Sequence, residues 1–294
     1  MSKAFIGTGV AVVTPFYRQG NVDFSAMERV LEHVIDKGVD YIVVLGSTGE
    51  ASTLSLREQA SVADFVVDTV NGRKPLVLGM SGNATQALIE RIKDANLEGY
   101  DAILSAAPYY NKPGQKGIFS HFKNIASVSP VPIILYNVPG RTASNIAPET
   151  CLQLASEFEN IIGIKEASGN MNQCMELLRR KPKDFLVISG EDALTVPLMS
   201  VGAAGVISVT ANVLPGYVSR MVSCCRANKF QEAATIHHKL LPLTNTLFEE
   251  GNPVGVKTAL EVLGLSSPFV RLPLVKGSKA LSNKLTDLLA DFSE

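Results

Sequence analysis

The chain has 294 residues, of which 46% are hydrophobic and 19% are charged, and its formal net charge is −1. This composition is typical of a globular protein with a large core, and the small net charge excludes strong attraction to nucleic acid or to an anionic membrane surface. No apolar run is long enough to span a bilayer, and the N-terminus lacks the basic and apolar segments of a signal peptide. We therefore expect a cytoplasmic protein with neither membrane nor nucleic-acid partners.

Eight short apolar runs along the chain predict β-strands. They cover residues 9–13, 41–45, 76–78, 102–105, 133–136, 161–165, 186–189 and 205–208. Continuous apolar runs are typical of parallel strands covered on both faces, and eight is the number that closes a β/α barrel. The absence of a Gly-x-Gly-x-x-Gly turn favours a barrel over an open dinucleotide-binding sheet.

Helix signals alternate with these strands. Asp23 or Ser25 can cap a helix that runs to about residue 37, and Ser55 begins a capping box before a helix over residues 60–70. Asn83 is expected to begin a helix that ends near residue 99, and Pro148 suits the first turn of a helix that ends near residue 158. This alternation predicts a parallel α/β architecture.

The pattern changes after residue 208. Residues 215–228, 229–248, 253–263 and 276–292 each have the pattern of a helix, with no strand between them. The first completes the barrel, and no flexible linker precedes the others. We predict a TIM (β/α)8 barrel over residues 1–225 and a C-terminal helical region over residues 226–294 that packs on it.

The cysteines and histidines give no sign of a metal site. Cys151, Cys174, Cys224 and Cys225 lack zinc-type spacing, and the adjacent pair is poorly placed to form a disulfide. None of the four histidines lies in a metal-ligand motif. We expect reduced, structural thiols, as in most cytosolic proteins, and no metal.

Lys165 is the most informative residue, because it ends the apolar run over residues 161–165. Burying an ammonium group is costly, so lysine is rare in such a run. Desolvation favours the neutral amine, which can attack a carbonyl to form a Schiff base. Taken alone, the pattern favours a simpler interpretation, a strand-end lysine whose stem packs while its head reaches water.

Polar residues follow several other strands, at the ends where β/α barrels carry their chemistry. They are Ser47, Thr48, Tyr109, Tyr110, Tyr136, Arg141 and Gly190. Each has a structural explanation of its own, such as a glycine-rich turn, aromatic packing or a surface cation, and Glu191 with Asp192 fits an anion pair at a helix start. Together they favour catalysis, since a Schiff-base lysine needs hydroxyl groups to move protons and a cation to hold a carboxylate.

Five segments in order carry a resemblance to a known family. They are Gly-Ser-Thr-Gly-Glu at 46–50, Pro-Tyr-Tyr-Asn-Lys-Pro at 108–113, Tyr-Asn-Val-Pro-Gly-Arg-Thr at 136–142, Gly-Ile-Lys-Glu-Ala-Ser-Gly at 163–169 and Gly-Val-Ile-Ser at 205–208. Together they resemble the dihydrodipicolinate synthase family, within the lysine-dependent aldolases and lyases related to N-acetylneuraminate lyase. The resemblance implies a TIM barrel, usually in a homotetramer built as a dimer of tight dimers. It also implies condensation of pyruvate with L-aspartate-4-semialdehyde to 4-hydroxy-tetrahydrodipicolinate, on the route to diaminopimelate and lysine.

The resemblance also implies roles for single residues. Lys165 would form the Schiff base with pyruvate, and Tyr136 would donate and accept the proton. Thr48 would relay that proton, and Tyr110 would connect the relay to solvent. Ser47 and Thr48 would hold the pyruvate carboxylate, and Arg141 would bind the carboxylate of the semialdehyde. Gly190 and the Ile207 carbonyl would lie beside the substrates, and Tyr109 would cross the tight-dimer interface. No metal or organic cofactor is implied, because the lysine imine is itself the electron sink.

Two departures from the family pattern bear on specificity and regulation. Ser47 stands where most synthases have threonine, and Ser-Thr is also usual in the neuraminate lyases, but the hydroxyl is kept. Lysine-inhibited members carry a glutamate and histidines where this chain has Ala87, Leu56 and Gln59. The second departure predicts weak or absent feedback inhibition by lysine.

Two other functions fit parts of the pattern. A lyase of a sugar acid such as N-acetylneuraminate would use the same Lys165 chemistry, but a cation at Arg141 suits a small dicarboxylate-like product better than a sugar. A non-catalytic barrel that binds a small acid would have no need of the combined lysine, tyrosine and threonine residues.

Overall fold

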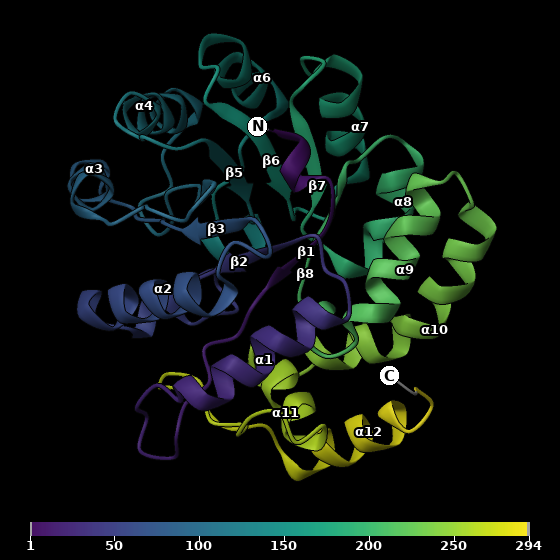
Figure 1. Ribbon diagram of the computed structural model, residues 1–294. Helices are drawn as coiled ribbons and strands as arrows, with labels where there is room; N and C mark the ends of the chain where they lie inside the picture. Colours follow the sequence, from purple (N-terminus) through teal and green to yellow (C-terminus); the bar gives the residue numbers. More distant parts are fainter. Residues whose placement is uncertain (1, 293–294) are drawn as a thin grey trace.

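Eight parallel strands close into a barrel in the computed structural model, which describes residues 2–292 (Figure 1). The strands are β1 (Gly7–Ala11), β2 (Tyr41–Val44), β3 (Leu76–Gly79), β4 (Ala102–Ala106), β5 (Ile133–Asn137), β6 (Ile161–Glu166), β7 (Leu186–Ser189) and β8 (Gly205–Ser208). Each strand pairs with the next, and β8 pairs with β1, which confirms the predicted (β/α)8 barrel. The strands from β2 to β8 lie within one residue of their predicted bounds.

The predicted bounds of β1 are wrong by two residues at each end. The strand begins at Gly7, which pairs with Gly205 of β8, and the buried residues Val12 and Val13 follow its end. The backbone N–H of Val13 donates to the Asn212 side chain at 3.2 Å, so that this loop has its own hydrogen-bond partner. An apolar run alone does not distinguish a strand from the buried loop that follows it.

Helices surround the barrel. They are α1 (Phe24–Asp36), α2 (Leu56–Val70), α3 (Thr85–Asp94), α4 (Gln115–Ala126), α5 (Pro139–Thr142), α6 (Pro148–Glu157), α7 (Met171–Arg180), α8 (Thr195–Ser200) and α9 (Pro215–Arg226), with 3-10 turns η1 (Ser2–Phe5), η2 (Ala51–Thr53), η3 (Asp192–Leu194) and η4 (Thr210–Asn212). Asp23 caps α1, Ser55 and Glu58 form the predicted capping box of α2, and Pro148 begins α6. These start signals are therefore confirmed.

The predicted bounds of α3 are wrong at both ends. The backbone is still extended at Ala84, so the helix begins at Thr85 and not at Asn83. It ends at Asp94, and the Asn96 side chain then accepts a hydrogen bond from the Glu98 backbone N–H at 3.1 Å. Asparagine side chains compete with helical hydrogen bonds in this way and favour turns.

Two apolar layers stabilise the fold. One fills the barrel interior, where Phe5 of η1 packs edge-on against Tyr41 near the amino ends of the strands, and Tyr136 and Ala167 lie in the same cluster near the other end. The second and larger layer lies between the strands and the surrounding helices. Both faces of the sheet are thus buried, as the continuous apolar strands predict.

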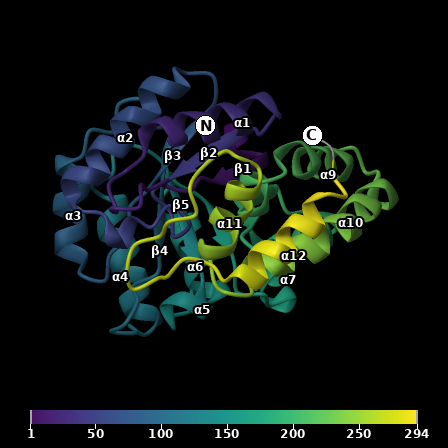
Figure 2. The same cartoon turned by 90° about the horizontal axis from the view of Figure 1, so that it is seen from below.

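Three helices follow the barrel: α10 (Phe230–Phe248), α11 (Val254–Val262) and α12 (Lys279–Leu289). Helix α10 packs against α8 and α9 of the barrel as well as against α11 and α12. The segment between α11 and α12 extends away from both helices before the chain turns back (Figure 2). Helix α12 then packs against α10. The four helices predicted after residue 208 are confirmed, although the last begins and ends three residues inside its predicted bounds. The division of the chain at residue 225 stays a prediction.

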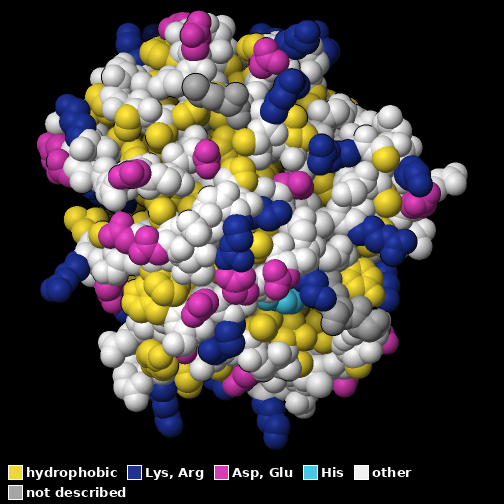
Figure 3. Space-filling view, viewed as in Figure 1, with side chains coloured by type: hydrophobic (Ala, Val, Ile, Leu, Met, Phe, Trp, Pro, Cys, Tyr) yellow, Lys and Arg dark blue, Asp and Glu magenta, His cyan; other side chains and the backbone are white. Residues whose placement is uncertain are grey.

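The surface carries both signs of charge. On the face drawn in Figure 3, basic and acidic side chains are interspersed, in keeping with the net charge of −1. None of the described helices is long and apolar enough to cross a membrane.

Candidate active site

A β-bulge in β6 turns Lys165 toward the inside of the barrel. The pairing of β5 with β6 shifts between Ile133 and Ile134, which leaves one extra residue in β6. Strict alternation from Ile161, which packs in the outer layer, would have put Lys165 on the outside as well. The extra residue reverses that alternation, so Lys165 faces the interior and pairs with Tyr136.

The Lys165 amine lies against Tyr136. Its Nζ atom is 4.4 Å from the centroid of the tyrosine ring. The two residues are only 5% and 7% exposed, so the head of Lys165 does not reach into bulk water. The structure therefore overturns the simpler interpretation that the strand pattern favours when it is taken alone.

Gly190 leaves the space that the lysine side chain occupies. It follows β7, and a Cβ atom added to it would lie 2.6 Å from the Ala167 Cβ and 3.0 Å from the Lys165 Cε. Both distances are shorter than the contact distance of two carbon atoms. A residue larger than glycine at this position would thus displace Lys165.

Two adjoining cavities meet at the carboxyl ends of the strands. The smaller, of about 50 Å³, is lined by six of the predicted residues: Ser47, Thr48, Tyr136, Arg141, Lys165 and Gly190. The larger, of about 440 Å³, shares Ser47, Tyr136 and Arg141 with the smaller one and extends to Tyr109. A lysine, two hydroxyl side chains, a tyrosine and an arginine therefore surround one small space.

Two predicted residues lie elsewhere. The Tyr110 side chain lines neither cavity and is 88% exposed, and its backbone adopts a left-handed conformation with φ +69°. Ile207 is buried in the barrel interior with Tyr136 and lines neither cavity. The roles of both residues stay predictions.

Asn252 is a site residue that the sequence reasoning missed. Its side-chain NH₂ group donates to the Thr48 hydroxyl at 2.9 Å, and its backbone carbonyl accepts from Arg141 Nη2 at 3.2 Å. It lines both cavities. Because it lies just before α11, far along the chain from either partner, no spacing pattern in the sequence points to it.

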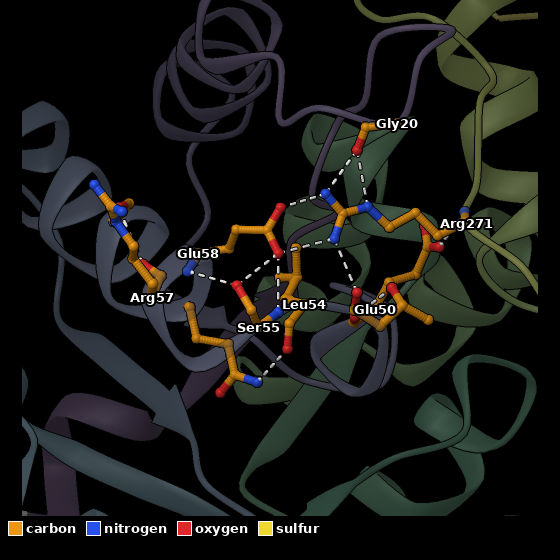
Figure 4. A network of polar contacts seen from close by, with 10 residues as sticks. Gly20, Glu50, Leu54, Ser55, Arg57, Glu58 and Arg271 are labelled. Carbon is orange, nitrogen blue, oxygen red and sulfur yellow. Dashed lines mark hydrogen bonds and ion pairs between the residues drawn. The ribbon is translucent and has the colours of Figure 1, made fainter.

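A buried polar network holds the loop after β2 against the C-terminal helices. Lys257 of α11 and Glu50 are 2.5 Å apart and almost fully buried, and the Arg271 backbone N–H donates to the same carboxylate at 3.0 Å. The Arg271 guanidinium also binds Glu58 and the Gly20 carbonyl (Figure 4). Burial lowers the pKa of Lys257 to about 8, against the opposing effect of Glu50.

Two carboxylates follow Gly190 and have different surroundings. Asp192 is buried and accepts hydrogen bonds from Ser208 and from two backbone N–H groups; burial raises its pKa and these bonds oppose the rise. Burial also raises the pKa of Glu191, and Asp192 adds to that effect, while Lys165 and Arg141 oppose it. Glu191 lines the smaller cavity, whereas Asp192 does not.

Comparisons with known proteins place the whole chain in one family. Residues 4–291 match the model of the dihydrodipicolinate synthetase family. A relative from Flavobacterium psychrophilum named 4-hydroxy-tetrahydrodipicolinate synthase is 52% identical over 283 residues, which are 96% of this chain and 97% of the relative. A relative of the same name from Bacillus subtilis is 43% identical over 92% of this chain and 93% of its own length.

Solved structures of the same family share the fold over nearly the whole chain. The dihydrodipicolinate synthase of Aquifex aeolicus aligns with a TM-score of 0.94 and 41% identity over 98% of both chains. The chloride-inhibited synthase of Acinetobacter baumannii, solved in complex with pyruvate, aligns with a TM-score of 0.94 and 40% identity over 97% of this chain and 98% of that one.

The fold and the site define a class, the β/α-barrel enzymes in which a buried lysine lies at the carboxyl end of a strand. Within this class, the chain belongs to the dihydrodipicolinate synthetase family. Its relatives favour the synthase interpretation over a lyase of a sugar acid.

Proposed function

We propose that this protein condenses pyruvate with L-aspartate-4-semialdehyde to give 4-hydroxy-tetrahydrodipicolinate, a step toward diaminopimelate and lysine. The observation that carries the proposal is the buried Lys165 amine beside Tyr136, in a small cavity that Arg141 also lines. The shared name of the relatives supports the choice of substrates.

The reaction begins when the neutral Lys165 amine attacks the ketone of pyruvate, and loss of water leaves an imine. Dehydration needs an acid within reach of the departing oxygen, and the Tyr136 hydroxyl is our candidate for it. The Thr48 hydroxyl accepts a hydrogen bond from Asn252, which leaves its own proton free to be relayed. Ser47 and Thr48 are proposed to hold the pyruvate carboxylate, with Gly190 beside it.

Carbon–carbon bond formation follows from the imine. Loss of a proton from the methyl carbon gives an enamine, whose carbon attacks the aldehyde carbon, and the aldehyde oxygen takes up a proton. The amine of the semialdehyde then attacks the imine carbon, closes the ring and releases the Lys165 amine. The protonated imine is the electron sink at each stage, so the proposed reaction uses no metal or organic cofactor.

Borohydride trapping tests the first step. Borohydride with pyruvate should leave the mass of reduced pyruvate on Lys165, and Lys165→Ala should abolish both trapping and nearly all turnover. Absence of the adduct in the wild-type protein would refute the proposed function.

Arg141 is proposed to bind the carboxylate of the semialdehyde. Arg141→Ala should spare trapping of pyruvate but lower kcat/KM for the semialdehyde by about tenfold to a hundredfold, the usual effect of removing a charge-assisted hydrogen bond. Loss of pyruvate trapping in a folded Arg141 variant would contradict this role.

We also propose that the protein assembles as a homotetramer in the cytoplasm, with Tyr109 at a contact between copies. Support comes from the exposure of Tyr109 (41%) and of the α2 residue Leu56 (63%), since exposed large hydrophobic side chains are typical of interfaces. One solved structure in the comparison is described as a monomeric synthase variant, so the oligomeric state of this protein is to be measured directly. Sedimentation equilibrium that gives a monomer at micromolar concentration would refute the assembly.

Feedback inhibition by lysine is proposed to be weak or absent. The synthase of Cyanidioschyzon merolae has been solved with lysine bound. In this chain Gln59 donates hydrogen bonds to the Ala51 and Leu54 carbonyls and accepts one from Arg91, so its side chain is already engaged. Strong inhibition of turnover by submillimolar lysine would contradict the proposal.

A further inference from the structure

The Glu191 carboxylate lines the smaller cavity and has no hydrogen-bond donor among the described residues. The residue follows Gly190 and is partly buried. Its backbone groups bond to Ser189 and Thr195, but within residues 2–292 no group donates a hydrogen bond to its side chain. Its carboxylate lines the cavity without a hydrogen-bond donor from the described chain, so a ligand that enters the cavity can donate hydrogen bonds to it.

The charges around the cavity are otherwise cationic. Lys165 and Arg141 line it, and Glu191 is the one carboxylate among its described lining residues. In the adjoining larger cavity the only other lining carboxylate of the described chain is Glu50, which is bound to Lys257. Glu191 is therefore the anion available to a cationic group of a substrate.

We propose that Glu191 binds the α-ammonium group of the second substrate while Arg141 binds its carboxylate. This inference rests on the proposed function, because it takes the second substrate to be an α-amino acid that bears an aldehyde. Glu191 and Arg141 both line the cavity that holds Lys165, so a zwitterion held between them keeps its aldehyde carbon near the imine. The pair selects an aldehyde that carries the α-amino group over one that lacks it.

Ring closure gives the carboxylate a second use. The ammonium must lose a proton before its nitrogen can attack the imine carbon, and the carboxylate bound to it is the nearest acceptor. The pKa of Glu191 is raised by burial, which makes the carboxylate a better base than an exposed glutamate. The proton moves from nitrogen to Glu191, and the nitrogen lone pair forms the new bond to carbon.

Another role for Glu191 would be only to offset the charges of Lys165 and Arg141. Such a role would affect pyruvate and every semialdehyde to the same degree. Recognition of the ammonium, by contrast, affects only a substrate that carries it. Succinate semialdehyde keeps the carboxylate and the aldehyde but lacks the amine, so it separates the two roles.

The test compares the wild-type protein with Glu191→Gln, Glu191→Asp and the control Glu98→Gln, which removes the same charge at an exposed position. Glu191→Gln should lower kcat/KM for aspartate-4-semialdehyde by about tenfold to a hundredfold. Its inhibition constant for succinate semialdehyde should stay within about twofold of wild type, as should pyruvate trapping. Glu191→Asp should keep part of the activity, and Glu98→Gln should behave as wild type.

Equal losses for the two semialdehydes in Glu191→Gln, or no loss for either, would overturn the proposal. Arg141→Ala provides the internal comparison, because it should weaken both semialdehydes. Failure of the proposed function has a different signature: the wild-type protein would then fail to trap pyruvate or to consume aspartate-4-semialdehyde.

Discussion

Gly190→Ala should displace Lys165 without removing any catalytic group. The added Cβ would lie 2.6 Å from the Ala167 Cβ and 3.0 Å from the Lys165 Cε, whereas non-bonded carbons rest about 3.5–4.0 Å apart. Relieving both contacts requires movements of about 0.5–1 Å, and a misplacement of about 1 Å can cost about a hundredfold in rate. The lysine side chain can move by itself, whereas the closer contact with Ala167, which directly follows β6, also requires a shift of the backbone.

The assay measures the rate of borohydride trapping with pyruvate, the turnover of both substrates, and unfolding in urea. We expect imine formation to slow by about a hundredfold and stability to fall by about 1–3 kcal/mol, the usual cost of overpacking. Gly114→Ala is the matched control, because its Cβ would meet no atom within 4 Å and its φ of −68° suits alanine. If Gly190→Ala trapped pyruvate and turned over substrate as fast as the wild type, the space beside Lys165 would not be needed for catalysis.

Three further predictions concern the groups that hold the site in place. Asn252→Ala should lower kcat by about tenfold, because Thr48 loses the hydrogen bond that orients its hydroxyl. The steady-state KM for pyruvate should change little, and an unchanged kcat would refute this positioning role. Lys257→Met should lower the free energy of unfolding by about 3–5 kcal/mol, because it leaves the buried Glu50 carboxylate without its ion-pair partner. A loss below about 1 kcal/mol in a denaturant titration would contradict this prediction. The Arg271 guanidinium lowers the pKa of Glu58 to about 2 from an ordinary 4.5, so the pair stabilises the fold above pH 4.5 and this contribution disappears as the pH falls toward 2. Since Glu58 is partly exposed, we expect Glu58→Gln to cost about 1 kcal/mol at pH 7 and nothing near pH 2; an equal cost at both pH values would exclude the ion pair as the cause.

The sequence by itself determined the barrel and the ends of the strands at which chemistry occurs. Parallel strands buried on both faces must be apolar along their length, so β2 to β8 were visible as continuous runs. The capping box at Ser55 and the proline at Pro148 marked helix starts because those signals act within a few residues. Where two local structures share one pattern, as after β1 and around α3, the predicted bounds were wrong.

Only the tertiary structure decided which side chains meet. The bulge that turns Lys165 into the barrel depends on the pairing of β5 with β6. The residues around Lys165 are apolar on both faces of the strand, so their pattern does not indicate which face Lys165 is on. The Asn252 contact joins residues about two hundred positions apart, and the lack of a hydrogen-bond donor to Glu191 among the described residues depends on every neighbour around it. Local patterns report secondary structure because its hydrogen bonds are local, whereas a catalytic site is made by packing between distant segments, which no short stretch of sequence contains.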